Sequence, residues 1–296
     1  MGRKATDVDA QIQLLKDRGL YIDDDEKAKE YLLDIGYYRL GFYWHYFEVD
    51  ENHNLREGIS LDDIIKLYYF DVDLRNLLGK YLYRIEVHFR TQVVYHVSNH
   101  YLQSPTWFND PRVVHAPFIQ KLPKIYNDKF KSKNVPIRDH HAKYINDIYA
   151  PTWKTLEFFT FGQVYTLFKN LKEDIVRQKV SDVYQIRDID VLENHILALI
   201  NIRNICSHSG VLFDCNQPLG IRRIPNKRYR LRTRNQTNLN ASIRLILFVL
   251  SKVSQNRAND LESELIVLFA NARTNGAVNE MIDRDCNINC VKGIIQ

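Results

Sequence analysis

The feature that most constrains this chain is a helical pattern of apolar residues between about residues 60 and 100. Apolar side chains recur there at spacings of mostly three and four. Ser60 is a favourable N-cap, acidic residues follow in the first turn, and the next proline is Pro105. The apolar positions are Ile64, Leu67, Tyr68, Val72, Leu74, Leu78, Tyr81, Leu82, Ile85, Phe89 and Val93. This pattern predicts one long helix, or two abutting helices, on which the rest of the chain packs.

Shorter stretches with the same periodicity predict further helices, whereas a strand pattern is almost absent. The predicted helices cover 10–20, 24–33, 153–171, 174–183, 190–207, 239–253 and 260–270. Residues 104–151 contain six of the eight prolines and are predicted to form loops and short helices. We therefore expect an all-α fold. Its predicted parts are a small helical N-terminal region (1–58), a helical core (59–215) and a basic segment followed by C-terminal helices (216–296).

Composition excludes several classes of protein. The chain has 296 residues, 45% of them hydrophobic and 26% charged, which is typical of folded protein rather than disorder. Its longest apolar runs, 245–250 and 265–270, are far shorter than the roughly 20 residues of a membrane span. The N-terminus lacks the apolar stretch of a signal peptide, so we expect a cytoplasmic protein that has no membrane partner and keeps its cysteines reduced. The four cysteines lack the paired spacing of a zinc site, and we expect no metal and no cofactor.

The net charge of +5 is distributed unevenly along the chain. The segment 221–234 holds seven basic residues and no acid, and without it 34 basic residues stand against 36 acidic ones. Cations at this density repel each other unless a polyanion is near, which predicts RNA binding. The alternative is a solvated loop that aids solubility. The alternation around Tyr229 favours an extended segment or small hairpin. The predicted RNA-binding residues are Arg222, Arg223, Lys227, Arg228, Arg230, Arg232 and Arg234.

One group of residues has the composition of a catalytic site. It is the run from Arg203 to His208, RNICSH, at the end of the predicted helix 190–207. Asn204 and His208 are four residues apart and share a helix face, so the amide could hydrogen-bond the imidazole and fix its tautomer. Arg203 offers a planar donor group to a phosphate. The helix dipole also favours arginine and histidine at a C-terminus, and the pattern alone leaves this structural interpretation open.

Such a site would cleave RNA without a metal ion. His208 would move a proton at the 2′-hydroxyl or at the leaving 5′-oxygen, and Arg203 would stabilise the charged phosphorane. The product would then be a 2′,3′-cyclic phosphate.

The sequence resembles known families in several places. The RNxxxH pattern before a loop is similar to that of the HEPN superfamily of nucleotide-binding and ribonuclease domains. The stretches 14–47, 64–96, 150–168 and 197–214 resemble, in the same order, the Abi-like (AbiD/AbiF-type) abortive-infection family. The resemblance implies a HEPN-like helical bundle that cleaves or binds RNA in phage defence. Family members often continue the motif with a second histidine and an arginine, where this chain has Ser209 and Val211.

The resemblance also implies roles for residues outside the motif. Glu86 and Arg90 match the polar pair of the family's IE-x3-R segment, and such charges would face the RNxxxH helix. The alternative is an ordinary surface pair. Glu157 could be a buried acid that orients Arg203, or it could be exposed to solvent. HEPN-type sites usually bring two motifs together, so we expect a homodimer with both Arg203–His208 pairs at one cleft.

The leading hypothesis is therefore a metal-independent endoribonuclease of anti-phage defence. The alternatives are a non-catalytic RNA-binding module, a toxin held inactive by a structured noncoding RNA, and a protein-interaction module. The aromatic stretch 36–47 could stack unpaired bases, but we interpret it as a small core, since aromatic rings have the largest burial energies.

Overall fold

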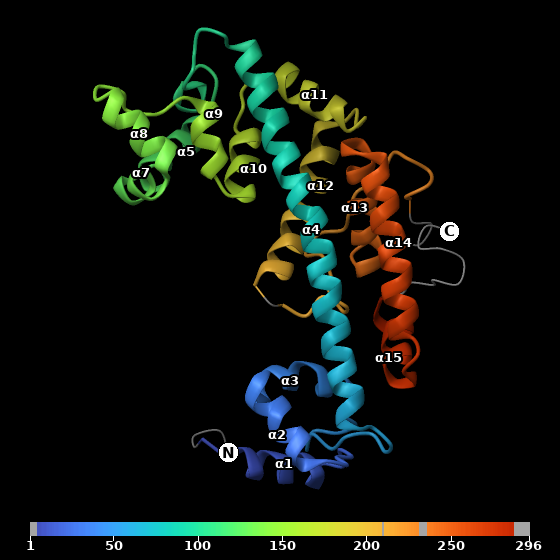
Figure 1. Ribbon diagram of the computed structural model, residues 1–296. Coiled ribbons are helices and arrows are strands. Elements are labelled where there is room, and N and C mark those ends of the chain that lie inside the picture. Colours follow the sequence, from blue (N-terminus) through green and yellow to red (C-terminus); the bar gives the residue numbers. More distant parts are fainter. Residues whose placement is uncertain (1–4, 209, 231–235, 287–296) are drawn as a thin grey trace.

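The computed structural model describes residues 5–208, 210–230 and 236–286, and this part of the chain is all-α, as predicted (Figure 1). Extended pairing in the described ranges is limited to three isolated bridges between single residues. The N-terminal helices are α1 (Val8–Asp17), α2 (Asp25–Asp34) and α3 (Tyr37–Trp44), followed by the 3₁₀ turn η1 (His45–Phe47). Among the described helices, none is both long enough and apolar enough to cross a membrane.

The predicted long helix is a single element, α4 (Leu61–His100). Ser60 and Asp63 form a capping box, because the Asp63 carboxylate accepts the backbone N–H of Ser60 at 2.9 Å while Asp63 N–H donates to the Ser60 hydroxyl at 3.3 Å. At 40 residues the helix is about 60 Å long and runs through most of the molecule (Figure 1).

Four later helices pack on α4 and complete the main core. They are α11 (Asp174–Val183), α12 (Ile189–Ser207), α13 (Leu239–Val253) and α14 (Gln255–Ala272). The chain continues through α15 (Gly276–Met281) into the π turn η4 (Ile282–Cys286). One hydrophobic core contains buried residues from α1 through to η4. The three regions predicted at 1–58, 59–215 and 216–296 contribute to this shared core, and their boundaries stay a prediction.

The predicted helix 153–171 is wrong as a single element. It is divided into α9 (Thr152–Thr155), the 3₁₀ turn η3 (Leu156–Phe158) and α10 (Phe161–Lys169). The reason is local: Thr160 and Gln163 form a second capping box, which starts a new helix in the middle of the predicted one. The aromatic stretch 36–47 forms α3 and η1, and its Tyr43, Trp44 and Phe47 are buried, as the core interpretation predicted. Tyr38 is exposed.

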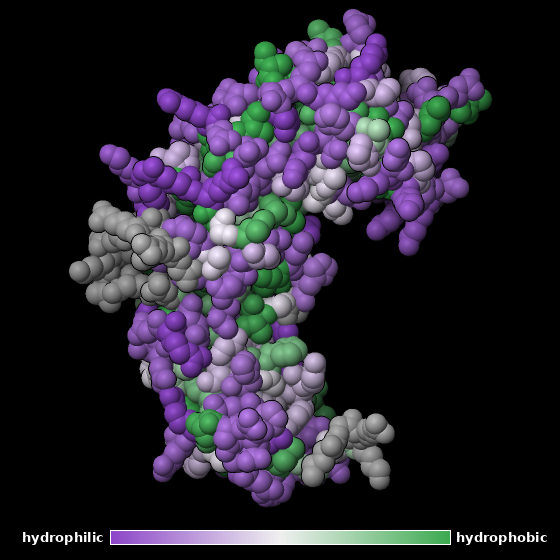
Figure 2. All heavy atoms as spheres, turned by 180° about the vertical axis from the view of Figure 1, so that it is seen from behind, coloured by the Kyte–Doolittle hydropathy of each residue, from purple (hydrophilic) through white to green (hydrophobic). Residues whose placement is uncertain are grey.

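Residues 116–155 form an arm of short helices that projects from the side of α4, away from the N-terminal helices (Figure 1). After the 3₁₀ turn η2 (Trp107–Asn109), the arm contains α5 (Ala116–Ile119), α6 (Leu122–Ile125), α7 (Asp128–Lys133), α8 (Val135–Lys143) and α9. Its own small core is built on Tyr126, Ile137 and Ala150. Seen from behind, the molecule is hollowed between the arm and the N-terminal helices (Figure 2).

The basic segment connects α12 to α13. Its described part, 221–230, is irregular and contains no strand. The Ile221 N–H donates to the carbonyl of Gln236 at 2.9 Å, which closes the loop at its base. The predicted hairpin would include residues 231–235, which lie outside the described ranges, and it stays a prediction.

Candidate functional site

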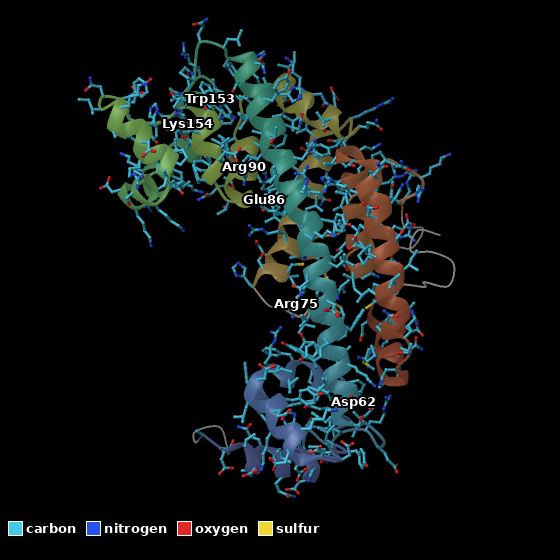
Figure 3. All side chains as sticks on the ribbon, in the orientation of Figure 1. Asp62, Arg75, Glu86, Arg90, Trp153 and Lys154 are labelled. Atoms are coloured by element: carbon cyan, nitrogen blue, oxygen red, sulfur yellow. The ribbon has the colours of Figure 1, made fainter. Side chains whose placement is uncertain are left out.

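The candidate site is organised around a buried carboxylate, Glu86 of α4. Arg203 of α12 donates from Nε to Glu86 Oε2 at 3.1 Å, and Arg90 donates from Nη2 to Oε1 at 3.2 Å. Glu86 is only 5% exposed, and Figure 3 shows it on the same side of α4 as Arg90. The structure thus brings Glu86 against the RNxxxH helix, where one carboxylate holds two arginines from different helices.

Arg90 supports this arrangement from inside the protein. It is buried, its Nη2 also donates to the carbonyl of Phe159 at 3.3 Å, and its Nη1 donates to Glu157 at 3.5 Å. Its Nε is buried without a hydrogen-bond partner. Glu157 therefore pairs with Arg90 and not with Arg203, and its side chain is 58% exposed. The suggestion that Glu157 is a buried acid orienting Arg203 is wrong, because η3 places it at the protein surface.

Arg203 is held at one edge and accessible at the other. Its side chain is 31% exposed. Glu86 takes its Nε–H, and Nη1 donates to Asn204 Oδ1 at 3.3 Å. Within the described ranges, its Nη2 has no hydrogen bond. The guanidinium is thus oriented while it keeps donors for an anion such as a phosphate.

His208 is the C-cap of α12, and it is exposed. Its backbone N–H donates to the carbonyl of Asn204 at 2.9 Å, but the predicted bond between the Asn204 amide and the imidazole is not formed. The reason is that His208 has left helical geometry, with φ −110° and ψ 21°, while the Asn204 oxygen accepts from Arg203. Within the part of the chain that the structure describes, no side-chain hydrogen bond orients the imidazole, which faces solvent.

Asp71 of α4 is a residue that sequence reasoning missed. Its carboxylate is fully buried and accepts the backbone N–H groups of Leu212 and Phe213, both at 2.8 Å. The other oxygen accepts the Tyr43 hydroxyl at 2.9 Å and pairs with Arg75 at 3.2 Å. Burial raises the pKa of Asp71, although its hydrogen bonds oppose the shift. The chain just beyond His208 is thereby fixed to α4 and to α3.

A signal for Asp71 was present in the sequence. The acid continues the apolar spacing of the long helix, because it lies four residues after Leu67 and three before Leu74. An acid at a core position needs partners, and Arg75 one turn later is the local one.

The predicted RNA-binding arginines lie away from this site. The carbonyl of Arg222 accepts from His195 Nε2 at 2.9 Å, and His195 precedes Arg203 by eight residues, about 12 Å along α12. Arg228 pairs with Glu262 of α14 at 2.8 Å, and the Arg222 side chain reaches Asp190 at 3.9 Å. Arg230 donates to the carbonyls of Ile224 and Pro225. Arg223 and Lys227 are exposed, whereas Arg232 and Arg234 lie outside the described ranges.

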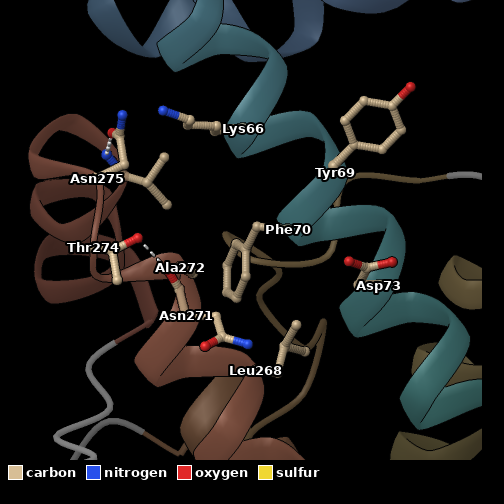
Figure 4. Close-up of a pocket in the computed structure, with 10 residues that line it drawn as sticks. Lys66, Tyr69, Phe70, Asp73, Leu268, Asn271, Ala272, Thr274 and Asn275 are labelled. Carbon is tan, nitrogen blue, oxygen red and sulfur yellow. Dashed lines mark hydrogen bonds between the residues drawn. The ribbon is translucent and has the colours of Figure 1, made fainter.

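Two further features were considered as functional sites, a metal-binding group and a cavity. The described ranges contain no group of three or more His, Cys, Asp or Glu side chains placed to hold a metal ion. A cavity of about 290 Å³ lies between α4 and the end of α14, lined by residues that include Phe70, Leu268 and Asn271 (Figure 4). Phe70 precedes Glu86 by 16 residues, about 24 Å along α4, so this cavity is distinct from the Arg203 site.

Comparison with known proteins identifies the class. A family model described as Abi-like protein matches residues 30–214, which is more than half of the chain. The chain therefore belongs to the Abi-like protein family. The matched range includes α4, the arm and the whole Glu86–Arg203–His208 group, and membership points to abortive-infection defence as the biological setting. Neither curated proteins nor solved structures gave a match.

Proposed function

We propose that this chain is a metal-independent endoribonuclease of the HEPN type that acts in abortive-infection defence in the cytoplasm. The observation that carries the proposal is the geometry of Arg203, which the buried Glu86 holds by one edge at the helix end where His208 is exposed. A fixed cation and an accessible imidazole are two of the groups that cleavage through the 2′-hydroxyl uses.

In this mechanism each residue has one task. His208 moves a proton at the 2′-hydroxyl or at the leaving 5′-oxygen, and Arg203 stabilises the charge on the phosphorane. The 2′-oxygen forms a bond to phosphorus as the bond to the 5′-oxygen breaks, which yields a 2′,3′-cyclic phosphate and a 5′-hydroxyl. Glu86 and Arg90 are positioning residues, since they reach the substrate only through Arg203. Asn204 is proposed as a further site residue, through its contact with the Arg203 guanidinium.

We propose that the active form is a homodimer. One chain supplies a single Arg203–His208 pair, and a second pair from a symmetric copy would serve both the attacking and the leaving oxygen. An isologous contact brings the same surface of both copies together, and the exposed end of α12 is available for it.

The test is RNA cleavage in EDTA, followed by end-group analysis for a cyclic phosphate. His208→Ala and Arg203→Ala should each lower the rate by about 10²–10⁴-fold, the usual contribution of a proton-transfer group or a positioned charge. His100→Ala is the matched control, since His100 pairs with Glu173 at the far end of α4. Cleavage that stops in EDTA, or that is undiminished in His208→Ala, would refute the mechanism.

The second candidate is a module that holds a structured RNA without cutting it, or a toxin held inactive by such an RNA. One observation favours it: the imidazole of His208 is not oriented by Asn204, so the resting site is incomplete. Co-purification of a discrete RNA with wild-type protein, together with no cleavage of any RNA tested, would support this candidate. Partner binding that is insensitive to salt would instead indicate a protein-interaction module.

A further inference from the structure

The arm, residues 116–155, carries a concentrated positive charge that is separate from the predicted RNA-binding segment 221–234. It contains eight of the 41 basic side chains and three of the 36 acidic ones, so the rest of the chain holds 33 of each. The three acids are Asp128, Asp139 and Asp147. Six of the basic side chains are exposed and two, Lys131 and Lys154, are partly exposed. The exposed six are Lys121, Lys124, Lys129, Lys133, Arg138 and Lys143.

These charges are almost uncompensated. Among the described residues, the only ion pair that an arm lysine or arginine forms is Arg138 with its neighbour Asp139, at 3.3 Å. Lys131 and Lys143 lie over the rings of Tyr126 and Tyr144, which leaves their charge intact. A cluster of unpaired cations on a projecting element produces the positive potential that attracts a polyanion.

The arm is also a preformed scaffold. Tyr126 is buried with Ile137 and Ala150, and its hydroxyl accepts the backbone N–H of Ala150 at 2.8 Å. Phe130 packs against this cluster and against Phe159 of the main body. The lysines thus stand on short helices with a common core, so little backbone ordering is needed when they bind.

The base of the arm is connected to the candidate site through a series of ion pairs. Trp153 and Lys154 belong to α9, and Glu157 of the adjoining η3 pairs with Arg90, which shares Glu86 with Arg203. Figure 3 shows Trp153 and Lys154 beside the Arg90 segment of α4. Trp153 is 51% exposed, whereas the other two tryptophans, Trp44 and Trp107, are buried.

The arm and the C-terminal end of α12 lie on the same side of α4, whereas α14, which pairs with Arg228, lies along the other side (Figure 1). The hollow seen in Figure 2 separates the arm from the N-terminal helices, and the arm surface is largely hydrophilic in that view. A strand bound to the arm would therefore reach Arg203 without passing around α4.

We propose that the arm is the principal RNA-binding surface of this chain, where lysines bind the phosphates of a single strand and Trp153 stacks on one base. The identity of the polyanion rests on the proposed function. The placement of the surface rests on the unpaired charge, the exposed indole and the connection through Glu157 to Arg203.

The test compares two triple variants in the His208→Ala background, which prevents cleavage during the measurement. One is Lys124→Gln, Lys129→Gln and Lys133→Gln in the arm, and the matched control is Arg222→Gln, Arg223→Gln and Lys227→Gln. Both remove three exposed cations. Binding of a fluorescein-labelled single-stranded RNA of mixed sequence, roughly 20 nucleotides long, is measured by anisotropy over a range of salt concentrations. Circular dichroism confirms that both variants keep their helices.

The arm variant should bind at least tenfold more weakly at low salt, and its salt slope should fall by about 2, since each single-strand phosphate contact contributes roughly 0.7. The control variant should change the slope by less than about 0.7. Trp153→Ala should weaken binding roughly fivefold or more at every salt concentration, and Trp153→Phe should restore most of it.

An unchanged slope in the arm variant, a larger loss in the control, or no RNA binding by the parent protein would overturn the inference. Its failure is distinguishable from failure of the proposed function. Arm-dependent binding without any cleavage by wild-type protein supports the surface and refutes the nuclease. Cleavage that depends on His208 but is indifferent to the arm lysines does the reverse.

Discussion

The arm and the segment 221–230 are both rich in basic residues, yet the structure gives them different surroundings. The acids that meet the arginines are distant in sequence, Asp190 of α12 and Glu262 of α14. Among the described residues, the lysines and the arginine of the arm have a single acidic partner, Asp139, beside Arg138. A run of charges in a sequence thus measures how much charge is present. The fold determines how much of it is left uncompensated.

The chemistry of the two cations accentuates this difference. The planar guanidinium of Arg230 donates to the carbonyls of Ile224 and Pro225, at 3.1 Å each, and so serves as a structural tie within its own loop. A lysine ammonium is a hydrated point charge that stabilises a loop less readily, and it is left free to meet phosphates. The segment 221–230, called the arginine segment below, therefore has part of its charge engaged in contacts within the fold. The arm has almost none of its charge engaged in this way.

The largest expected effect concerns the connection between the arm and Arg203. Glu86→Ala would leave Arg90 buried without its main counter-charge, and we expect a loss of about 3–5 kcal/mol in the free energy of unfolding. Urea denaturation measures this loss directly. Glu157→Gln is the matched control, since it removes the other carboxylate that meets Arg90 but from an exposed position.

The control should cost less than about 1 kcal/mol, as exposed ion pairs do. Equal losses in the two variants would show that burial does not distinguish these carboxylates and that Glu86 is not the centre of the site. A small loss in Glu86→Ala would mean that the arm and Arg203 are held together by apolar packing alone.

The extent to which sequence predicted this molecule depends on how local each determinant is. Periodicity and the Ser60 cap predicted α4, because both act within a few residues. The contact between Glu86 and Arg203 crosses 117 positions, and only the family resemblance implied it. The contact from Asp71 to Leu212 crosses 141 positions and was missed.

Two of the wrong predictions have local causes. Asn204 and His208 have helical spacing, but a helix ends between them and their side chains do not meet. The predicted helix 153–171 failed at Thr160, where a capping residue outweighed an apolar pattern. The pairing of Arg228 with Glu262 could not be predicted, since nothing near Arg228 in the sequence indicates an acid 34 residues away.

An effect of intermediate size on stability is expected from His195, which holds the arginine segment through the Arg222 carbonyl. Burial lowers the pKa of His195 from 6.5 to about 4, and its Nδ1 is buried without a partner. Between these two pH values the unfolded chain binds a proton that the folded chain does not, so stability falls as the pH drops below 6.5 and the loss is complete near pH 4. A shift of this size corresponds to about 3 kcal/mol.

His195→Gln, which cannot titrate, should lack this part of the acid-induced loss, and the difference between the two unfolding curves isolates His195 from other groups. Amide hydrogen exchange should report earlier loosening at 221–224 than in the arm, because His195 donates to the Arg222 carbonyl. Parallel pH profiles for wild-type protein and the variant would contradict the anchoring role.

The smallest effect comes from releasing one arginine. Arg228 and Glu262 form a pair in which the arginine side chain is half exposed, so Glu262→Gln should change the free energy of unfolding by less than about 1 kcal/mol. The freed guanidinium should raise the salt slope of RNA binding by at most about 0.7, the contribution of one phosphate contact.

Glu264→Gln is the control, because it removes an equal charge from the same helix but releases Lys80 instead. If pairing by specific acids explains why the two basic regions differ, only Glu262→Gln should raise the slope. An equal rise in both variants would mean that overall charge governs RNA binding, and the distinction between the arm and the arginine segment would then be lost.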